Sequence, residues 1–397
     1  MTLTVEPTTI GAARRWSMLG ASTVAQAASA VAAHGPAFLI PALRQHEGLS
    51  LAEAGVVAAA PTVGVMLTLV AWGMLTDRRG ERLVLVLGLA LTAVFSGLAV
   101  LADGLVLLSA SLFLAGAAAA SANAASGRVV VGWFPPHRRG LAMGIRQMAQ
   151  PVGVAVAAVS MAVIADAHGI GAALLVPTVA AAVAAVVVLL VVVDPPRPPA
   201  VEGGAANPYR ADSFLARIHG VSVLLVVPQF VVWTFSLVWL VEERGWSPAA
   251  AGTLVAVAQV VAAFGRIAAG QLSDLVGSRM RPLRWVAVAA SATMALLGLA
   301  AGLDLSVAVP LLVIATVLTV ADNGLAFTAV AERAGPFWSG RALGLQNTAQ
   351  FLTSALVPPL GGLLVTHTGY AATFAVAALL PAVAVGLVPV RGEEELH

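Results

Sequence analysis

Long runs of apolar residues alternate with short polar segments along the whole chain. A helix of about 20 apolar residues spans the hydrocarbon core of a bilayer, and each run is close to that length. Because backbone groups in lipid must find hydrogen-bond partners within their own segment, the runs are predicted to be helices. The pattern predicts twelve spanning helices, at residues 17–41, 52–75, 83–102, 106–131, 141–165, 170–193, 214–241, 248–272, 285–303, 306–330, 341–365 and 370–390. The expected fold class is therefore an all-α integral membrane protein.

The composition supports a membrane protein and excludes several other classes. Hydrophobic residues make up 59% of the 397 residues and charged residues only 10%, whereas a soluble domain is about 25% charged. The chain contains no cysteine, which excludes disulfides and thiolate metal sites. The formal net charge of +2 and the absence of a basic tract predict no nucleic-acid partner. No cofactor or metal is expected.

The arginines lie mostly on one side of the predicted membrane. The inner segments include the pairs Arg14–Arg15, Arg78–Arg79 and Arg138–Arg139, while the outer loops hold Arg44 and Arg244. Cytoplasmic loops carry an excess of basic residues in membrane proteins. Both termini are therefore predicted to be cytoplasmic.

A polar stretch divides the chain near its middle. Residues 194–213, DPPRPPAVEGGAANPYRADS, are rich in proline and glycine and are predicted to be a loop. The predicted domains are an N-terminal six-helix bundle at 1–193, this central cytoplasmic loop at 194–213, and a C-terminal six-helix bundle at 214–397.

The two halves repeat two polar segments in the same order. GMLTDRRG, residues 73–80, aligns with GQLSDLVG, residues 270–277. RGLAMGIRQMAQ, residues 139–150, aligns with GRALGLQNTAQ, residues 340–350. Both matches have offsets near 200 residues, which indicates an internal duplication.

The first of these segments resembles the signature of the major facilitator superfamily, G-x-L-x-D-R-x-G-x-R between helices two and three. The first copy matches at Gly73, Leu75, Asp77, Arg78, Gly80 and Arg82; the second matches at Gly270, Leu272, Asp274, Gly277 and Arg279, with Leu275 in place of an arginine. The resemblance implies two pseudo-symmetric six-helix bundles and a secondary transporter that works by alternating access. It also implies a bacterial cytoplasmic membrane location and a chain that suffices as a monomer.

The chemistry of the motif favours a gate between the cytoplasmic ends of the two halves. Glycine lets helix ends approach closely, and an acid such as Asp77 can cap the positive end of a neighbouring helix. Rocking of one half against the other must break such a contact. The predicted gate residues are Gly73, Asp77, Arg78, Gly80, Arg82, Gly270, Asp274, Gly277 and Arg279, with Arg266 expected to form a salt bridge within the second copy. The alternative for the arginines is a plain positive-inside loop.

Asp322 is the most informative charge within the predicted spans. It lies about eleven residues from Arg333, which places it about 16 Å from the inner end of its helix and near the midplane of the bilayer. Ionisable residues at that depth are costly and usually functional. Asp322 is therefore predicted to exchange the coupling proton, with Asn323 beside it as a substrate contact. The alternative is a structural pair with an arginine of another helix.

Three further residues are candidates for binding substrate. Arg128 and Arg146 stand near the inner ends of helices four and five, and two guanidinium groups facing one cavity would favour an anion between them. The alternative is that one or both pair with Asp77 or extend toward the lipid headgroups. Trp233 in helix seven is expected to line the cavity, although packing explains it equally well.

The leading functional hypothesis is a proton-coupled carrier of a small organic or inorganic anion. A proton/drug antiporter that uses Asp322 as its cation site is the alternative, and a membrane receptor that transports nothing is the third hypothesis. The chain has no lysine and hence no nucleotide-binding loop of the G-x-x-x-x-G-K-[ST] kind, and no His-rich metal spacing. An enzyme is therefore not expected, and small-molecule substrate, protons and lipids are the expected partners.

Overall fold

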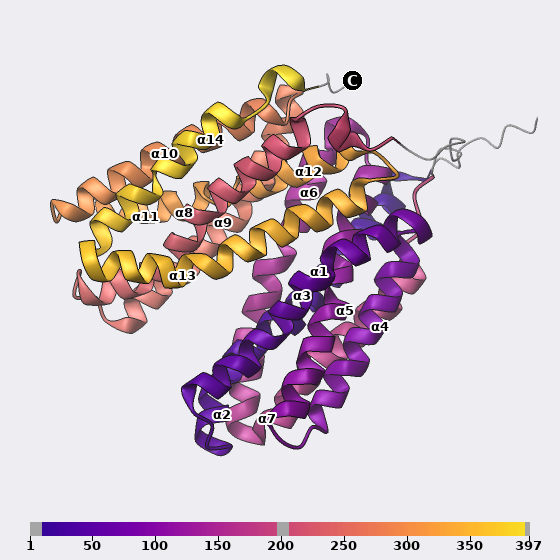
Figure 1. The fold of residues 1–397 in the computed structure, drawn as a ribbon, viewed down its shortest axis with the longest axis horizontal. Helices are drawn as coiled ribbons and strands as arrows, with labels where there is room; N and C mark the ends of the chain where they lie inside the picture. Colours follow the sequence, from indigo (N-terminus) through magenta and orange to yellow (C-terminus); the bar gives the residue numbers. More distant parts are fainter. Residues whose placement is uncertain (1–9, 197–205, 394–397) are drawn as a thin grey trace, which may run out of the picture. The chain divides into compact units, whose positions relative to one another are not determined.

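The computed structural model describes residues 10–196 and 206–393, and these residues form helices joined by short turns (Figure 1). The α-helices are α1 Ala12–His34, α2 Ile40–His46, α3 Leu51–Arg79, α4 Glu81–Val100, α5 Leu105–Trp133, α6 Pro136–Gln147, α7 Ala149–Val191, α8 Phe214–Glu242, α9 Pro248–Val276, α10 Met280–Gly302, α11 Ala308–Leu318, α12 Asp322–Ala334, α13 Ser339–Ala377 and α14 Leu379–Leu387. Three 3₁₀ turns, η1 Gly35–Leu39, η2 Pro208–Arg210 and η3 Val390–Gly392, complete the described elements.

Ten helical stretches within the described residues are long and apolar enough to cross a membrane. Two of them, Pro136–Val191 and Ser339–Gly392, contain 56 and 54 residues, which is more than twice the length that one crossing needs. Each is interrupted by a glycine in a non-helical conformation, Gly169 (φ 84°, ψ 171°) and Gly369 (φ 81°, ψ 171°). Gly80, which separates α3 from α4, has a similar conformation. Each long stretch therefore accounts for two of the twelve predicted crossings.

The described residues divide into two compact units. Unit 1 contains residues up to 135, residues 149–206 and residues 335–344; unit 2 contains residues 136–148, 207–334 and 345 onward. The division thus follows the predicted domain boundary at 194–213 except for two short segments, 136–148 and 335–344, that each belong with the other half of the sequence. Residues 197–205 of the predicted central loop lie outside the described residues.

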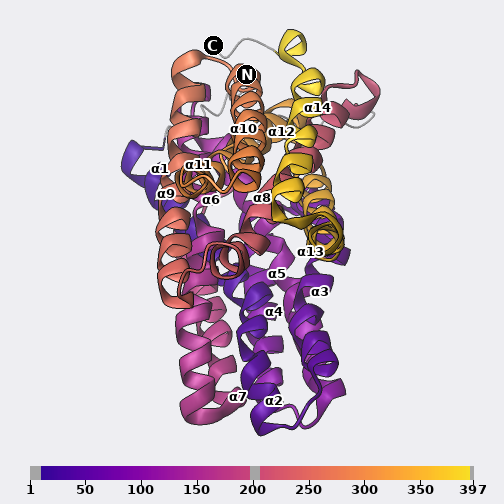
Figure 2. The same cartoon turned by 90° about the vertical axis from the view of Figure 1, so that its left-hand side faces the viewer.

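Unit 1 is a bundle in which α1, α3, α4, α5 and α7 run side by side (Figures 1 and 2). Gly64 of α3 and Gly116 of α5 each face the backbone of the other helix so closely that a Cβ atom would clash. Close backbone approach of this kind supplies packing contacts that replace the hydrophobic effect inside a bilayer. The first part of α7 packs on α1 at Gly153, and its second part meets α4 near Gly97.

Unit 2 has an apolar core where α8, α9, α10, α11 and α13 meet. Buried members of this core include Trp239, Met294, Leu312 and Phe374. The rings of Trp239 and Phe374 pack edge to face with centroids 5.8 Å apart, an arrangement that aromatic pairs favour. The helix α9 contacts α6 and α11, so that α6 is held in this unit through α9 and α12.

Four of the predicted continuous spans are interrupted in the structure: 17–41 at η1, 370–390 at Ala378, and two that lie beside buried charged residues. The predicted helix 306–330 consists of α11 and α12, which are separated at Thr319, Val320 and Ala321. The predicted helix 141–165 consists of α6 and the first part of α7, separated at Met148. Discontinuous helices in transporters place freed backbone groups beside bound ions and substrates. The breaks at Met148 and at residues 319–321 therefore mark places to look for function.

Candidate functional site

The acid of the first motif binds the start of α13. Asp77 is buried and accepts hydrogen bonds from the backbone N–H groups of Gly340 (2.8 Å) and Arg341 (3.1 Å). The Arg341 side chain also donates to Asp77, with Nε 2.8 Å from Oδ2. Because the first N–H groups of a helix are unsatisfied and carry the positive end of its dipole, they favour a carboxylate. Asp77 thus accepts hydrogen bonds from two N–H groups at the start of α13.

The acid of the second motif repeats this geometry at α6. Asp274 of α9 accepts hydrogen bonds from the backbone N–H groups of Gly140 (2.9 Å) and Leu141 (2.8 Å). Gly140 and Leu141 are the residues that align with Gly340 and Arg341 in the sequence repeat. The two repeated segments therefore contact each other crosswise, each hairpin motif with the second segment of the other half.

Paired glycines bring the backbones together at both places. A Cβ atom on Gly73 would lie within 3.0 Å of the Gly340 backbone, and the same holds for Gly270 and Gly140. We call the group Gly73, Asp77, Gly340 and Arg341 the first crossing, and the group Gly270, Asp274, Gly140 and Leu141 the second crossing. Any larger side chain at these glycines would push the acid away from its N–H partners.

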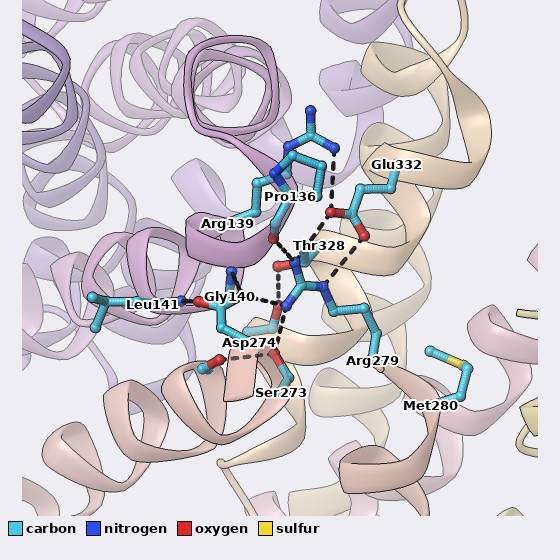
Figure 3. A network of polar contacts seen from close by, with 12 residues as sticks. Pro136, Arg139, Gly140, Leu141, Ser273, Asp274, Arg279, Met280, Thr328 and Glu332 are labelled. Atoms are coloured by element: carbon cyan, nitrogen blue, oxygen red, sulfur yellow. Dashed lines mark hydrogen bonds and ion pairs between the residues drawn. The ribbon is translucent and has the colours of Figure 1, made fainter. Parts of the chain in front are cut away.

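Arg279 connects the second crossing to α12 (Figure 3). Its guanidinium donates to Asp274 at 2.5 Å and to the Pro136 carbonyl at 2.5 Å, and it contacts the Glu332 carboxylate at 3.3 Å. Arg139 pairs with the same Glu332 at 3.4 Å. Burial alone would lower the pKa of Arg279, but Glu332 and Asp274 outweigh that effect and raise it. Arg279 is therefore a permanent positive charge at the centre of a buried network.

Three of the remaining motif residues, Gly80, Arg82 and Gly277, lie at the turns that follow α3 and α9. Gly80 has φ 101° between α3 and α4, which favours glycine. Arg82 donates its backbone N–H to Asp194 at 2.7 Å and its side chain to the Leu189 carbonyl at 2.6 Å. Gly277 ends α9 in the left-handed conformation with φ 64°, and Arg78 is exposed.

Replacing Gly80 with alanine is expected to destabilise the protein by about 1–3 kcal/mol. The added Cβ would lie 2.6 Å from the Asp194 carboxylate, and the backbone would keep a positive φ that alanine disfavours. The matched control is Gly97→Ala in α4, where the new methyl group would make an ordinary contact 3.6 Å from Thr178. Thermal unfolding in detergent should show a lower Tm for the first variant only. Equal Tm values for the two variants would contradict this account.

Arg128 forms ion pairs within unit 1. Its guanidinium lies 2.9 Å from Asp77 and 2.6 Å from Glu81, and all three side chains are buried. This is the alternative that the sequence left open for Arg128, a pair with Asp77. Arg146 belongs to unit 2, where it contacts Gln147 and Phe327.

Asp322 is a buried carboxylate to which no other side chain donates a hydrogen bond. It begins α12 directly after the helix break and is 1% exposed. Both carboxylate oxygens are buried and lack a partner. Arg266 of α9 acts on Asp322 electrostatically but forms no direct ion pair with it. The predicted alternative of a direct Asp–Arg pair is thus not formed, and Arg266 does not join the Asp274 network.

Arg146 and Arg266 meet at one residue of α6. Arg146 is 1% exposed and donates to the Gln147 side chain at 2.7 Å. Its guanidinium also lies 6.0 Å from the ring centroid of Phe327 on α12. Arg266 donates to the Gln147 backbone carbonyl at 2.7 Å. Gln147 thus links Arg146 to Arg266, and Arg266 acts electrostatically on Asp322; we call these three charged residues the buried cluster.

Two buried amides that sequence reasoning missed, Gln229 and Gln350, bind the predicted contact residue Asn323. Asn323 donates to Gln229 of α8 at 3.1 Å and accepts from Gln350 of α13 at 3.1 Å. Unit 1 holds a similar pair, in which Gln26 of α1 donates to Asn123 of α5 at 2.8 Å. Asn123 and Asn323 are 200 residues apart, so the repeat offset was the signal that could have led from Asn323 to Asn123.

Trp233 lies on α8 one turn beyond Gln229. Its ring packs against Phe230 with centroids 5.2 Å apart, and its indole nitrogen is buried without a hydrogen-bond acceptor. A buried indole N–H usually finds a partner. The geometry thus leaves Trp233 with a donor that a bound molecule can use.

Comparisons with known proteins agree with this architecture. The family model of the Major Facilitator Superfamily matches residues 20–358. An uncharacterized MFS-type transporter of Mycobacterium tuberculosis is 47% identical over 389 residues, which cover 97% of this chain and 87% of that protein. The hexuronate transporter of Bacillus subtilis is 28% identical over 127 residues, 32% of this chain and 30% of that one.

Solved transporters share the fold at low sequence identity. The fucose:proton symporter of E. coli superposes with a TM-score of 0.77 at 16% identity over 95% of this chain and 98% of that chain. The human organic anion transporter MFSD10 gives 0.71 at 15% identity over 94% and 99%. The predicted all-helical membrane fold is therefore confirmed. With the family model covering most of its length, the chain belongs to the major facilitator superfamily and is a multi-pass membrane transporter, not an enzyme.

Proposed function

We propose that this transporter moves a small anion together with protons. The observation that carries the proposal is the carboxylate of Asp322, which is fully buried with both oxygens lacking a donor beside the guanidinium of Arg266. A buried charge without hydrogen bonds is costly. Protonation removes that cost, so Asp322 suits the uptake and release of the coupling proton.

Arg146 is the proposed contact for the anion. Its guanidinium is buried and lies on the broken α6–α7 segment, and the fork of an arginine matches a carboxylate. Asn323 and Trp233 would add uncharged hydrogen bonds from α12 and α8. Two of the similar proteins have names that refer to organic anions, the hexuronate transporter and the organic anion transporter. Arg128 is better assigned to the first crossing, because Asp77 and Glu81 already neutralise it.

The two crossings are the proposed gate. Each joins an acid to the start of a helix from the other half of the sequence, so alternating access requires that these hydrogen bonds break and reform. The excess of arginine in the inner loops supports a cytoplasmic position for the gate and for both termini. A bacterial cytoplasmic membrane and a monomer fit the same proposal.

Transport by the purified protein in liposomes with a trapped pH dye tests this function. Small carboxylate anions are added first and lipophilic cations second. We expect anions to acidify the lumen, Arg146→Ala to reduce the rate by about 100-fold because a buried charge contact is worth several kcal/mol, and Asp322→Asn to abolish proton movement. Arg44→Ala, an exposed arginine outside the cluster, is the matched control and should transport normally.

Three results of the liposome assay would contradict the proposal. Proton movement with cations alone would make the protein an exporter of cationic compounds. Normal anion transport by Arg146→Ala would remove that residue from the site. No flux with either panel would favour a receptor function on the same fold.

A further inference from the structure

Pro151 leaves one carbonyl of the broken α6–α7 segment without its helical partner. In a continuous helix the N–H of residue 151 would donate to the carbonyl of Gln147, but proline has no N–H. Arg266 supplies the missing donor from α9, with Nη1 2.7 Å from the Gln147 oxygen. Arg266 is 5% exposed, so this is a buried hydrogen bond between a charged donor and a freed carbonyl.

The guanidinium of Arg266 has a second N–H donor that is not used. Its Nε is buried and has no hydrogen-bond partner. The carboxylate of Asp322 is close enough for its charge to act on Arg266, and it has no donor of its own. One buried guanidinium is therefore placed beside two acceptors, the Gln147 carbonyl and the Asp322 carboxylate, and contacts only the first directly.

Close packing holds the three helices of this arrangement together. A Cβ atom on Gly144 of α6 would lie 2.7 Å from the Arg266 carbonyl, and one on Gly324 of α12 would lie 3.6 Å from the Gly144 backbone. A Cβ atom on Gly324, two residues after Asp322, would also lie 3.9 Å from the Arg266 carbonyl, so the start of α12 packs against α9 at Arg266. Arg146 on α6 is bound by the Gln147 side chain, and α8 and α13 present the neutral amides of Gln229 and Gln350 to Asn323.

We infer that Arg266 is a positioning residue that passes between the Gln147 carbonyl and the Asp322 carboxylate as Asp322 loses and gains its proton. With Asp322 protonated, Arg266 holds the Gln147 carbonyl, and the Gln147 side chain holds Arg146. With Asp322 ionised, Arg266 turns to the carboxylate and releases Gln147, so that Arg146 loses its fixed position. The inference rests on the proposed function, since it explains how the proton on Asp322 controls the residue that contacts the anion.

Pro151→Ala tests the exchange directly, because alanine restores the N–H that satisfies Gln147 within the helix. Arg266 is then free for Asp322, and ionised Asp322 is favoured. We would record infrared spectra of the full-length protein in lipid films from acid to neutral pH and isolate the protonated carboxyl band of Asp322 by subtracting spectra of Asp322→Asn. The band should disappear about one pH unit lower in Pro151→Ala than in the unmodified chain, the effect of one charge-assisted hydrogen bond.

Two further variants complete the design. Arg266→Gln removes the guanidinium and should let the band persist to higher pH. Pro177→Ala, at a proline inside α7, changes a helix proline without an arginine contact and should leave the band unchanged. An identical band in Pro151→Ala and the unmodified chain would overturn the exchange, as would a shift of equal size in Pro177→Ala. The band is read without substrate, so this failure would leave the liposome test of anion transport standing.

Discussion

Replacing Asp77 with alanine is expected to destabilise the protein by about 3–5 kcal/mol, the usual cost of removing one partner from a buried ion pair. The change removes the acceptor for the N–H groups of Gly340 and Arg341. It also leaves Arg128, which is 4% exposed, with Glu81 as its remaining carboxylate among the ion pairs described here. The start of α13 should then separate from α3, because the Asp77 carboxylate that accepts from its first N–H groups is gone.

A cysteine reporter measures this separation apart from overall stability. The chain has no cysteine of its own, so Ser339→Cys introduces a single thiol at the start of α13, where Ser339 is 3% exposed. Maleimide should label this thiol slowly in the otherwise unmodified chain and at least tenfold faster when Asp77→Ala is added. Asp103→Ala, which removes an exposed acid from a loop, is the control for both Tm and labelling. Slow labelling in the Asp77→Ala background would show that Asp77 does not hold α13 in place.

Replacing Gly140 with valine should disrupt the second crossing by a different route, through steric overlap. The valine Cβ would fall within 3.0 Å of the Gly270 carbonyl and of the Arg279 guanidinium. Overpacking costs about 1–3 kcal/mol when side chains can yield, and more where the obstacle is backbone, as it is at Gly270. The helices α6 and α9 must move apart, and the hydrogen bonds from Gly140 and Leu141 to Asp274 are lost with them.

The expected result is a fall in Tm together with loss of transport in the liposome assay. Gly252→Val in α9 is the matched control, because a Cβ atom there meets nothing within 4 Å. An intermediate variant, Gly140→Ala, places only the Cβ in the contact and should lie between the control and the valine variant. If Gly140→Val unfolds and transports as Gly252→Val does, the close approach of α6 to α9 is not required for function.

The apolar runs predicted the helices well because lipid leaves the backbone no other way to satisfy its hydrogen bonds. They failed at the break between α11 and α12, since Thr319, Val320 and Ala321 include neither glycine nor proline. The break at Met148 carried a local signal in Pro151, which removes a helical donor. Sequence alone still gave no indication that Arg266, 119 residues from Gln147, donates the hydrogen bond that the Gln147 carbonyl lacks within its helix.

The sequence identified several residues of the candidate site but not the partners with which they interact. Asp322 was found because a charge deep in a span is costly, and the structure shows it without a donor. Arg128 and Arg146 were predicted to face one anion, yet Arg128 pairs with Asp77 and Glu81. Residue type and depth were readable from the chain, whereas the choice of partner depends on which helices pack together.

The sequence by itself determined a helical membrane transporter with a duplicated motif, because apolar length and the spacing of glycines and acids are local properties of the chain. Only the tertiary structure decided that the duplicated segments contact each other crosswise, Asp77 with Gly340 and Asp274 with Gly140. It also decided that Arg266 stands beside Asp322 and the freed carbonyl of Gln147. Those contacts join residues more than 50 positions apart, and they form only when packing of small residues brings separate helices within hydrogen-bond reach.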